Sequence, residues 1–416
     1  MGQRVVVIGG GIVGLSCGFF AKREGFDVTI VDPGVDEGRA SFGNAGVLAL
    51  CEQLPLATPK LMLQLPKMLL SSNSPLTIRW RYLPTLLPWL VRFALASSSG
   101  QVRRATQSLH AVMSGALDAH KEIATAARAR NMLAQTGWIK AYEKAPRRIA
   151  SKERETLTSL GVGMRDLSAQ ELTDLAPGFQ GVFEAATLYS DCYQVASPGK
   201  YISSITDACA AMGITFVRGK ATDFCFEGGA VRGILTDGNP GRIDADQFVI
   251  AGGAWSRRLA ARLGDDVPLD TERGYHFMLD VGDSTLLRTP LLWQEKSIVL
   301  SQMEDGLRMT SSVEFGGLEA PPRYDNIERT FASVQNTVPA LARTSVRSRW
   351  LGFRPSVPDS VPVIGRSAKH ANCLLAFGHG HLGLTLGPVT GKLITSQLAG
   401  KPPAIDIGPF SPSRFN

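Results

Sequence analysis

Short apolar runs alternate with polar stretches of helical spacing along this chain, and three of the runs end in a glycine-rich turn. These runs are residues 5–8, 243–251 and 373–377, and a helical pattern follows each turn. A buried strand, a turn of small residues and a helix form the repeating unit of an α/β sheet. Because the three units lie far apart in the chain, we expect one sheet assembled from distant segments, with a ligand over the carboxyl ends of its strands.

Between these units the spacing of apolar residues predicts further elements. Residues 101–131 carry apolar side chains on one helical face, which predicts one long helix. Ser168 and Glu171 form a capping box that begins a second helix, and Pro177 ends it. A helix after Pro198 precedes three short strands that we expect to form an antiparallel meander: residues 214–217, 223–226 and 231–235.

The first glycine turn has the residues of a dinucleotide site. Gly9 permits the tight turn, Gly11 lets backbone N–H groups approach a pyrophosphate at the positive end of the helix, and Gly14 lets the helix pack on the strand. Asp32 ends the next apolar run, where a carboxylate can hold ribose hydroxyls. A strand, three glycines, a helix and an acid in this order are much more specific than a glycine triplet alone.

Composition is of the ordinary globular type, and 416 residues are enough for two compact domains. The 44 Lys and Arg residues exceed the 37 Asp and Glu residues only modestly and are dispersed, so no nucleic-acid partner is expected. Six cysteines without CxxC spacing predict reduced thiols in a cytoplasmic protein. The first apolar run leads into a glycine turn rather than a cleavage site, so no signal peptide is predicted. We also predict no metal site.

The stretch 60–96 is unusually rich in Leu, Met, Trp and Phe. Pro84, Pro88 and Arg92 interrupt every window that could span a bilayer, so two short amphipathic helices fit better. These helices either pack on the protein's own substrate domain or lie in the lipid headgroup layer. In the second case the cations of the stretch would face lipid phosphate: Lys60, Lys67, Arg79, Arg81 and Arg92.

Taken together, the motifs resemble the D-amino-acid dehydrogenase and glycine oxidase branch of the FAD-dependent amine and amino-acid oxidoreductases. The resemblance runs from end to end of the chain, through residues 8–14, 41–46, 251–256, 352–355 and 378–383. The Gly-Phe-Arg-Pro segment at 352–355, followed by the Gly-His-Gly turn at 378–380, is the most specific part.

The resemblance implies a fold of mixed α/β and α+β class. A doubly wound, Rossmann-like FAD-binding domain would comprise residues 1–50, 195–265 and 345–416. An antiparallel-sheet substrate domain, interleaved with it, would comprise residues 51–194 and 266–344.

It also implies a FAD site. The glycines of the first turn would hold the pyrophosphate and Asp32 the adenosine ribose, while the N-terminus of the last helix would stabilise negative charge on the reduced ring. Neither the first turn nor residues 41–44 contain His or Cys, so non-covalent FAD is expected. The remaining residues implied to line the cofactor are Ile12, Val13, Ser41, Asn44, Ala45, Gly46, Ala221, Gly253, Gly380, Leu382, Gly383, Leu384 and Thr385.

Arg354 is the strongest candidate for a catalytic-site residue, because a fixed guanidinium can grip an amino acid's carboxylate and so decide which α-hydrogen faces the flavin. The alternative is a structural ion pair with Asp359. Tyr275 and His276 alternate along one expected strand, so only one of them can face the ring. His381 is a further candidate for a residue on the substrate side. It stands where related enzymes carry arginine or a small polar residue, so the identity of the substrate cannot be inferred from those enzymes.

The resemblance implies hydride transfer from the α-carbon of a D-amino acid to flavin N5, giving an imine, with cyclic D-prolines among the substrates. Electrons would pass to a quinone or another acceptor, from a cytoplasmic protein that can rest on the inner face of the membrane through residues 60–96. Alternatives are an oxygen-dependent amino-acid, glycine or sarcosine oxidase and, less favoured, a flavin enzyme of RNA modification or a non-catalytic flavin protein.

Overall fold

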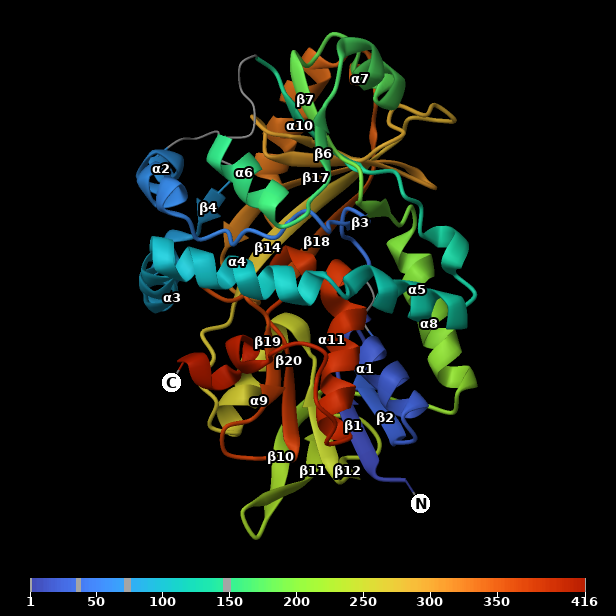
Figure 1. Ribbon diagram of the computed structural model, residues 1–416, viewed down its shortest axis with the longest axis vertical. Helices are drawn as coiled ribbons and strands as arrows, with labels where there is room; N and C mark the ends of the chain where they lie inside the picture. The colour runs from blue at the N-terminus through green and yellow to red at the C-terminus, as the bar shows by residue number, and fades with distance from the viewer. Residues whose placement is uncertain (1, 35–38, 71–75, 145–150, 416) are drawn as a thin grey trace.

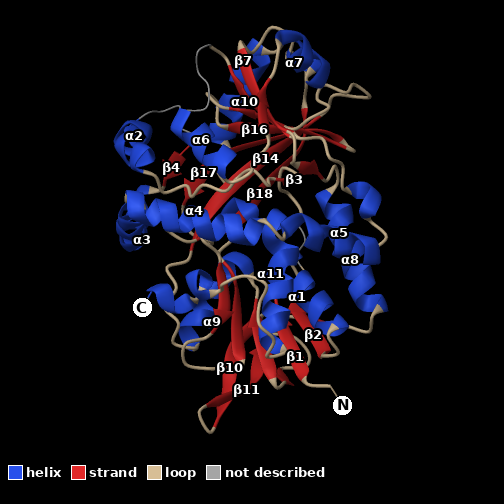
Figure 2. Cartoon of the chain, in the orientation of Figure 1, coloured by secondary structure: helices blue, strands red, loops and turns tan. Residues whose placement is uncertain are grey.

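Two sheets stacked along the long axis organise the molecule (Figure 1). The computed structural model describes residues 2–34, 39–70, 76–144 and 151–415. Strands gather in a lower and an upper group, and helices lie between and around them (Figure 2). The chain passes between the groups several times, which confirms an interleaved arrangement of a doubly wound sheet and a largely antiparallel one.

The lower sheet confirms the prediction that distant segments assemble around the first glycine turn. Its order is β19-β20-β13-β1-β2-β9, and all neighbours are parallel except β19 and β20. The three strands that precede glycine turns, β1, β13 and β20, are therefore adjacent. The strands are β1 (Arg4–Ile8), β2 (Asp27–Asp32), β9 (Thr215–Arg218), β13 (Gln247–Ile250), β19 (Val363–Arg366) and β20 (Cys373–Phe377).

The predicted meander is partly wrong. Its expected first strand is β9, which joins the lower sheet parallel to β2. The helix α8 (Pro198–Ala211) precedes β9 and serves as a crossover, which places the following strand parallel rather than in a hairpin. The antiparallel meander consists instead of β10 (Ala221–Glu227), β11 (Ala230–Thr236) and β12 (Arg242–Asp244).

Within the described ranges the upper sheet has nine strands, and it carries β14 (Asp270–Leu279) between β17 (Gly306–Phe315) and β18 (Val346–Ser356). Strand β18 falls within residues 345–416, which the sequence assigned to the FAD-binding domain, yet it pairs along its length with β14. The exact domain division stays a prediction. The other strands of this sheet are β4 (Leu76–Ile78), β5 (Trp138–Tyr142), β6 (Met164–Asp166), β7 (Ala185–Tyr189), β15 (Leu291–Trp293) and β16 (Ile298–Met303).

Helices cover both sheets. The single helix predicted over 101–131 is wrong: the chain forms α4 (Ser99–Met113) and α5 (Ala116–Ala126), with a break at Gly115. Glycine is a poor helix former, and here a Cβ would lie only 3.2 Å from Val389 Cγ2. The capping box of Ser168 and Glu171 is confirmed. The other helices are α1 (Ile12–Arg23), α2 (Pro59–Leu70), α3 (Leu83–Ala96), α6 (Ser151–Ser159), α7 (Ala169–Leu175), α9 (Ser256–Arg262), α10 (Asp325–Thr337) and α11 (Gly383–Leu398).

Helices α1 and α11 approach each other closely, because small residues form their contact. A Cβ at Gly391 of α11 would lie 2.6 Å from the carbonyl of Ser16 in α1, and one at Gly387 would lie 2.9 Å from Ile12 Cγ1. Such distances leave no room for a side chain. The contact fixes the two helices side by side, each following a strand of the same sheet.

We predict that Gly391→Ala lowers the free energy of unfolding by roughly 1–3 kcal/mol, because the added methyl overpacks the interface of α1 and α11. Urea denaturation measures the change. Gly100→Ala is the matched control: it also lies in a helix, its Cβ meets nothing within 4 Å, and alanine there should be neutral or slightly stabilising. Equal stability of the two variants would contradict the close contact.

Candidate functional site

The turn after β1 has the geometry of a dinucleotide cradle. Gly9 adopts φ +115°, and a Cβ there would lie 2.4 Å from Ala251 O. A Cβ at Gly14 would lie 1.9 Å from Gly9 O, so both positions require glycine. Helix α1 begins at Ile12, with Gly11 as an N-cap that has no side-chain oxygen and no acid in the first turn, which includes Val13. The positive end of α1 therefore fits a pyrophosphate.

Asp32 lies beside this turn. Its carboxylate accepts hydrogen bonds from the N–H groups of Gly10 (2.6 Å) and Gly34 (2.8 Å) and pairs with Arg39. The Gly219 N–H donates to Asp32 O (3.0 Å), which brings the segment leading to Ala221 to the same end of the sheet. This arrangement is consistent with an adenosine site at Asp32 and Ala221.

The segment 41–46 connects the cradle to the upper sheet. Ser41 Oγ accepts a hydrogen bond from Ile12 N–H (3.1 Å), and Asn44 bridges its own turn, donating to Ser41 O (2.6 Å) and accepting from Gly46 N–H (2.8 Å). Arg308 of β17 donates to Asn44 O (2.7 Å). Ala45 lies between these anchors and is partly exposed. The segment is thus held by helix α1 on one side and by strand β17 on the other, where a flavin ring would need support.

The two other glycine turns lie next to the first. Gly253 (φ +57°) follows β13, and Gly380 (φ +55°) follows β20. Gly380 and Leu382 form one 3₁₀ turn, and α11 then begins with Gly383, Leu384 and Thr385, without an acid or a side-chain cap. Two uncapped helix N-termini, those of α1 and α11, follow two strands of the same parallel sheet. The described residues therefore fit a bound dinucleotide with an electron-rich ring.

His379 and Thr385 have structural partners within this third turn. His379 Nε2 lies 2.9 Å from Thr390 Oγ1, as expected for a histidine between two glycines, and Thr385 Oγ1 accepts a hydrogen bond from Ala49 N–H (3.0 Å). Both side chains are buried.

Arg354 lies on the face of the upper sheet that also carries Glu272. The two residues are register partners on β18 and β14. The guanidinium crosses Gly274, where a Cβ would lie 2.5 Å from Arg354 Cζ, so glycine is required beneath it. Burial lowers the pKa of Arg354, and the nearby Glu272 opposes this shift. Asp359, the alternative partner considered for Arg354, pairs with Arg414 instead (2.8 Å).

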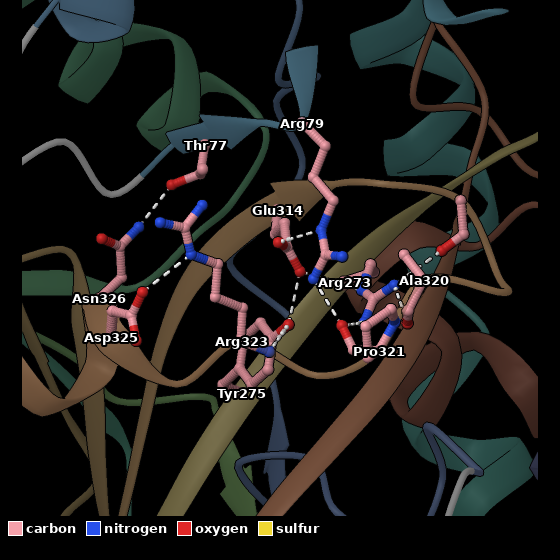
Figure 3. Close-up of polar contacts among 11 residues, drawn as sticks. Thr77, Arg79, Arg273, Tyr275, Glu314, Ala320, Pro321, Arg323, Asp325 and Asn326 are labelled. Atoms are coloured by element: carbon pink, nitrogen blue, oxygen red, sulfur yellow. Dashed lines mark hydrogen bonds and ion pairs between the residues drawn. The ribbon is translucent and has the colours of Figure 1, made fainter. Parts of the chain in front are cut away.

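Strand alternation separates Tyr275 from this face. The Tyr275 hydroxyl donates to Glu314 and accepts from Arg323 N–H (3.1 Å), and Glu314 also pairs with Arg79 (2.7 Å) and Arg273 (3.0 Å) (Figure 3). The structure therefore does not bring Tyr275 and Arg354 together, contrary to the sequence-based preference for a tyrosine hydroxyl beside the carboxylate.

His276 shares the face of Arg354. Its Nδ1 lies 2.8 Å from Gly43 O, and its ring stacks on Trp350 with centroids 4.9 Å apart. A Cβ at Gly43 would lie 2.2 Å from the Trp350 ring, so that ring contacts the segment expected to hold the flavin edge. His276 thus positions this segment rather than reaching the pocket described next.

One pocket joins Glu272, His381 and Ser356. Glu272 is only 7% exposed and has no hydrogen bond or ion pair within the described part of the chain, and Ser356 Oγ is buried without a partner there. Buried polar groups are normally satisfied, so this set points to a polar ligand. Apolar side chains form another part of the pocket wall: Leu54, Leu56, Trp89, Phe93 and Leu109.

A partly buried ion pair lies close to His381. Lys140 Nζ is 3.1 Å from Glu52 Oε1. Burial alone would raise the pKa of Glu52, but Lys140 and His381 outweigh it and lower that pKa. Burial lowers the pKa of His381, and the carboxylates of Glu52 and Glu272 oppose this shift. His381 therefore lies between two carboxylates, Lys140 and Arg354.

The sequence analysis missed Glu52, Lys140 and Glu272. Glu272 could have been found, because strand alternation places it in phase with Gly274 and His276. Glu52 and Lys140 come from segments whose contact depends on tertiary packing, and no local pattern marks them.

The parallel sheet, its dinucleotide cradle and the two uncapped helix N-termini together fit an oxidoreductase that binds a dinucleotide cofactor. The chain belongs to the DAO family of FAD-dependent oxidoreductases, whose model, described as "FAD dependent oxidoreductase", matches residues 4–397. The protein is thus an FAD-dependent amino-acid oxidoreductase.

Known relatives agree with this assignment. The chain is 33% identical to a D-amino-acid oxidase of Bradyrhizobium diazoefficiens, with 100% of this chain and 99% of the relative covered. It is 25% identical to a D-amino acid dehydrogenase of Dechloromonas aromatica, covering 96% and 98%. The fold is similar to glycine oxidase from Geobacillus kaustophilus, with a TM-score of 0.72, 22% identity and 99% of each chain covered.

Burial holds three histidines neutral and predicts acid sensitivity. It lowers the pKa of His276 and His379 to about 3 and that of His120 to about 4. Because the unfolded chain protonates these imidazoles near pH 6.5, it binds more protons than the folded protein below that pH. We predict that the free energy of unfolding falls as pH drops from 6.5 toward 4, by up to about 1.4 kcal/mol per pH unit for each histidine.

Urea denaturation at pH 7.0, 6.0 and 5.0 measures this slope. His379→Gln should reduce the slope by about one proton's contribution, whatever its effect on stability at pH 7. If the pH dependence of the free energy of unfolding is unchanged in that variant, His379 is not held neutral in the folded protein.

Proposed function

We propose that the protein oxidises D-amino acids, which Arg354 and Glu272 bind as zwitterions. The observation that supports this is the register pair itself: Arg354 and Glu272 lie opposite each other on adjacent strands, and Glu272 lines the pocket. An amino acid carries the complementary charges one carbon apart. Arg354 would bind the carboxylate through two hydrogen bonds, and Glu272 would bind the ammonium group.

The roles of the residues follow from these positions. Glu272 accepts a proton from the ammonium group, so that the amine is neutral when the α-hydrogen leaves. Bound FAD would supply the hydride acceptor for that hydrogen, and the amino acid would form an iminium ion that loses a proton to give the imine. The N-termini of α1 and α11 supply positive charge to the pyrophosphate and the ring. Non-covalent binding of FAD stays a prediction.

The apolar wall supports substrates with apolar or small cyclic side chains, cyclic D-prolines among them. Trp89, Phe93 and Leu109 would remove such a side chain from water. A primary amine would yield an imino acid that hydrolyses to a 2-oxo acid and ammonia, and a proline would yield a pyrroline carboxylate.

We predict that Arg354→Leu lowers kcat/KM for a D-amino acid by the equivalent of roughly 3–5 kcal/mol, because the carboxylate loses a desolvated charge-assisted pair. Glu272→Gln should lower kcat/KM near neutral pH and recover part of it at alkaline pH, where the amine needs no base. Steady-state kinetics with a dye acceptor from pH 6 to 10 measure both effects.

Arg347→Leu is the matched control, since Arg347 lies on the same strand but pairs with Asp280 (2.8 Å) at its far end. If amino-acid amides prove as good substrates as the free acids, Arg354 does not bind the carboxylate.

The helices α2 and α3 support a second proposal, contact with a membrane. The inner face of α3 packs into the protein through Leu86, Trp89 and Phe93. Its outer face exposes one apolar side chain at each successive helical turn: Leu87 (54% exposed), Val91 (52%) and Leu95 (69%). Trp80 and Leu63, which precede α3 in the sequence, are also exposed. No helix in the described ranges is both long and apolar enough to cross a bilayer.

The cations of this region are arranged differently from the expectation. Lys60 and Arg81 are exposed, but Arg79 is held by Glu314, and Arg92 donates to Phe415 O. Residues 71–75 and the Lys67 side chain lie outside the described residues. We propose that the outer face of α3 rests in the headgroup layer of the inner membrane leaflet and that electrons pass to a quinone there.

An oxygen-dependent oxidase is the competing function, and the printed name of the Bradyrhizobium relative favours it. Hydrogen peroxide formed in stoichiometric amount, at the rate of dye reduction, would decide for the oxidase.

We predict that the protein floats with anionic liposomes and that Leu87→Glu with Leu95→Glu abolishes flotation, because two charges would enter the apolar layer. Phe226→Glu is the control: Phe226 is exposed to 42% on β10, away from α3, and its replacement should leave flotation unchanged. If the wild-type protein stays in the soluble fraction, the membrane contact fails while the flavoenzyme assignment stands.

A further inference from the structure

Helix α11 contains a gap in its backbone hydrogen bonding at the end that faces the proposed flavin site. Leu384 lies in the first turn, and the residue four positions later is Pro388. Proline has no N–H group, so the helix itself offers no i+4 donor to Leu384 O. Leu384 is 6% exposed, and a buried carbonyl without a donor is costly.

His120 of α5 supplies the missing donor. Its Nε2 lies 2.9 Å from Leu384 O, and its Nδ1 lies 3.0 Å from the Tyr201 hydroxyl on α8. A carbonyl only accepts, so Nε2 carries the proton, and Nδ1 then accepts from the tyrosine O–H. His120 and Tyr201 are both 0% exposed, and burial lowers the pKa of His120 to about 4. The imidazole is therefore neutral at physiological pH, in one tautomer.

We propose that His120 is a positioning residue for the cofactor site, replacing the helix hydrogen bond lost at Pro388 and fixing the first turn of α11. That turn contains Gly383, Leu384 and Thr385, whose backbone N–H groups direct positive charge at the ring. This inference rests on the proposed position of the flavin. Without the His120 donor, the first turn of α11 would be free to bend at Pro388. Its backbone N–H groups would then no longer be held in a fixed orientation toward the ring.

The position of the donor explains why proline is tolerated here. A proline inside a helix also pushes the carbonyl four residues earlier away from the axis. In α11 that carbonyl points toward α5, where the His120 ring receives it. Tyr201 fixes the ring from the other side, so three helices converge on one carbonyl.

The test compares His120→Leu, His120→Gln and the double variant His120→Leu with Pro388→Ala. Glutamine keeps a donor of similar reach, and alanine at 388 restores the helix's own N–H to Leu384 O. Two readouts are measured: hydrogen exchange of peptides covering residues 380–392 in the protein without FAD, and the affinity of the FAD-loaded protein for sulfite. Sulfite adds to oxidised flavin and leaves negative charge on the ring, so its affinity reports the positive charge directed there.

His120→Leu is expected to speed exchange in these peptides and to weaken sulfite binding about tenfold, the effect of one buried hydrogen bond. His120→Gln and the double variant should return both readouts to within about twofold of the wild type. Pro388→Ala alone should change neither readout, because His120 still donates.

The proposal is overturned if the double variant is no better than His120→Leu, or if His120→Leu leaves exchange unchanged. A third outcome is that His120→Leu speeds exchange and the double variant restores it, while the affinity for sulfite stays constant. That outcome overturns the link to the flavin and shows that the proposed position of the ring is wrong. Should His120→Leu fail to fold, folding rescued by Pro388→Ala supports the hydrogen-bond replacement, and no rescue overturns it.

Discussion

Close contact between α1 and α11 is the constraint on which the rest of the structure depends. Because Gly391 meets the backbone of Ser16 and Gly387 meets the Ile12 side chain, neither position of α11 has room for a side chain of its own. Both helices begin after a strand of the same parallel sheet, so their N-termini end at one edge of it. Neither terminus carries an acid or a side-chain cap. Two positive helix ends directed to one place can support a long anionic cofactor along its length.

At strand β14, the two faces of the upper sheet carry charged groups in different environments. On one face, Glu272 lies opposite Arg354 in the register and lines the pocket. On the other, Glu314 is fully paired with Arg79 and Arg273 and receives the Tyr275 hydroxyl. A buried carboxylate with hydrogen-bond partners in the protein stabilises the fold, whereas one without such partners is available to bind a ligand. The same residue type therefore occurs in two different environments on neighbouring strands, Glu272 on β14 and Glu314 on β17, and the partners distinguish them.

Sequence reasoning was strongest where local geometry and function coincide. Positions 9 and 14 have to be glycine for steric reasons, so the sequence alone predicted the dinucleotide turn. The adjacency of β1, β13 and β20 followed from the repeated strand-to-glycine junctions. It was weaker where packing decides. The break at Gly115, the crossover that makes β9 parallel and the side to which Tyr275 points all depend on neighbours distant in sequence. Lys140 and Glu52 meet only after folding, and no periodicity marks them.

Helix α3 belongs to two environments at once. Trp89 forms part of the pocket wall, and its indole N–H donates to Ser356 O (3.3 Å), two residues beyond Arg354. Leu87 and Val91, one half-turn away on either side, lie on the outer surface. Pro88 lies between Leu87 and Trp89 inside this helix and removes one backbone donor there, so the segment that joins the pocket wall to the outer surface can bend. The pocket wall and the surface proposed to contact a membrane are thus opposite sides of one short helix, so a substitution that shifts this helix changes both at once.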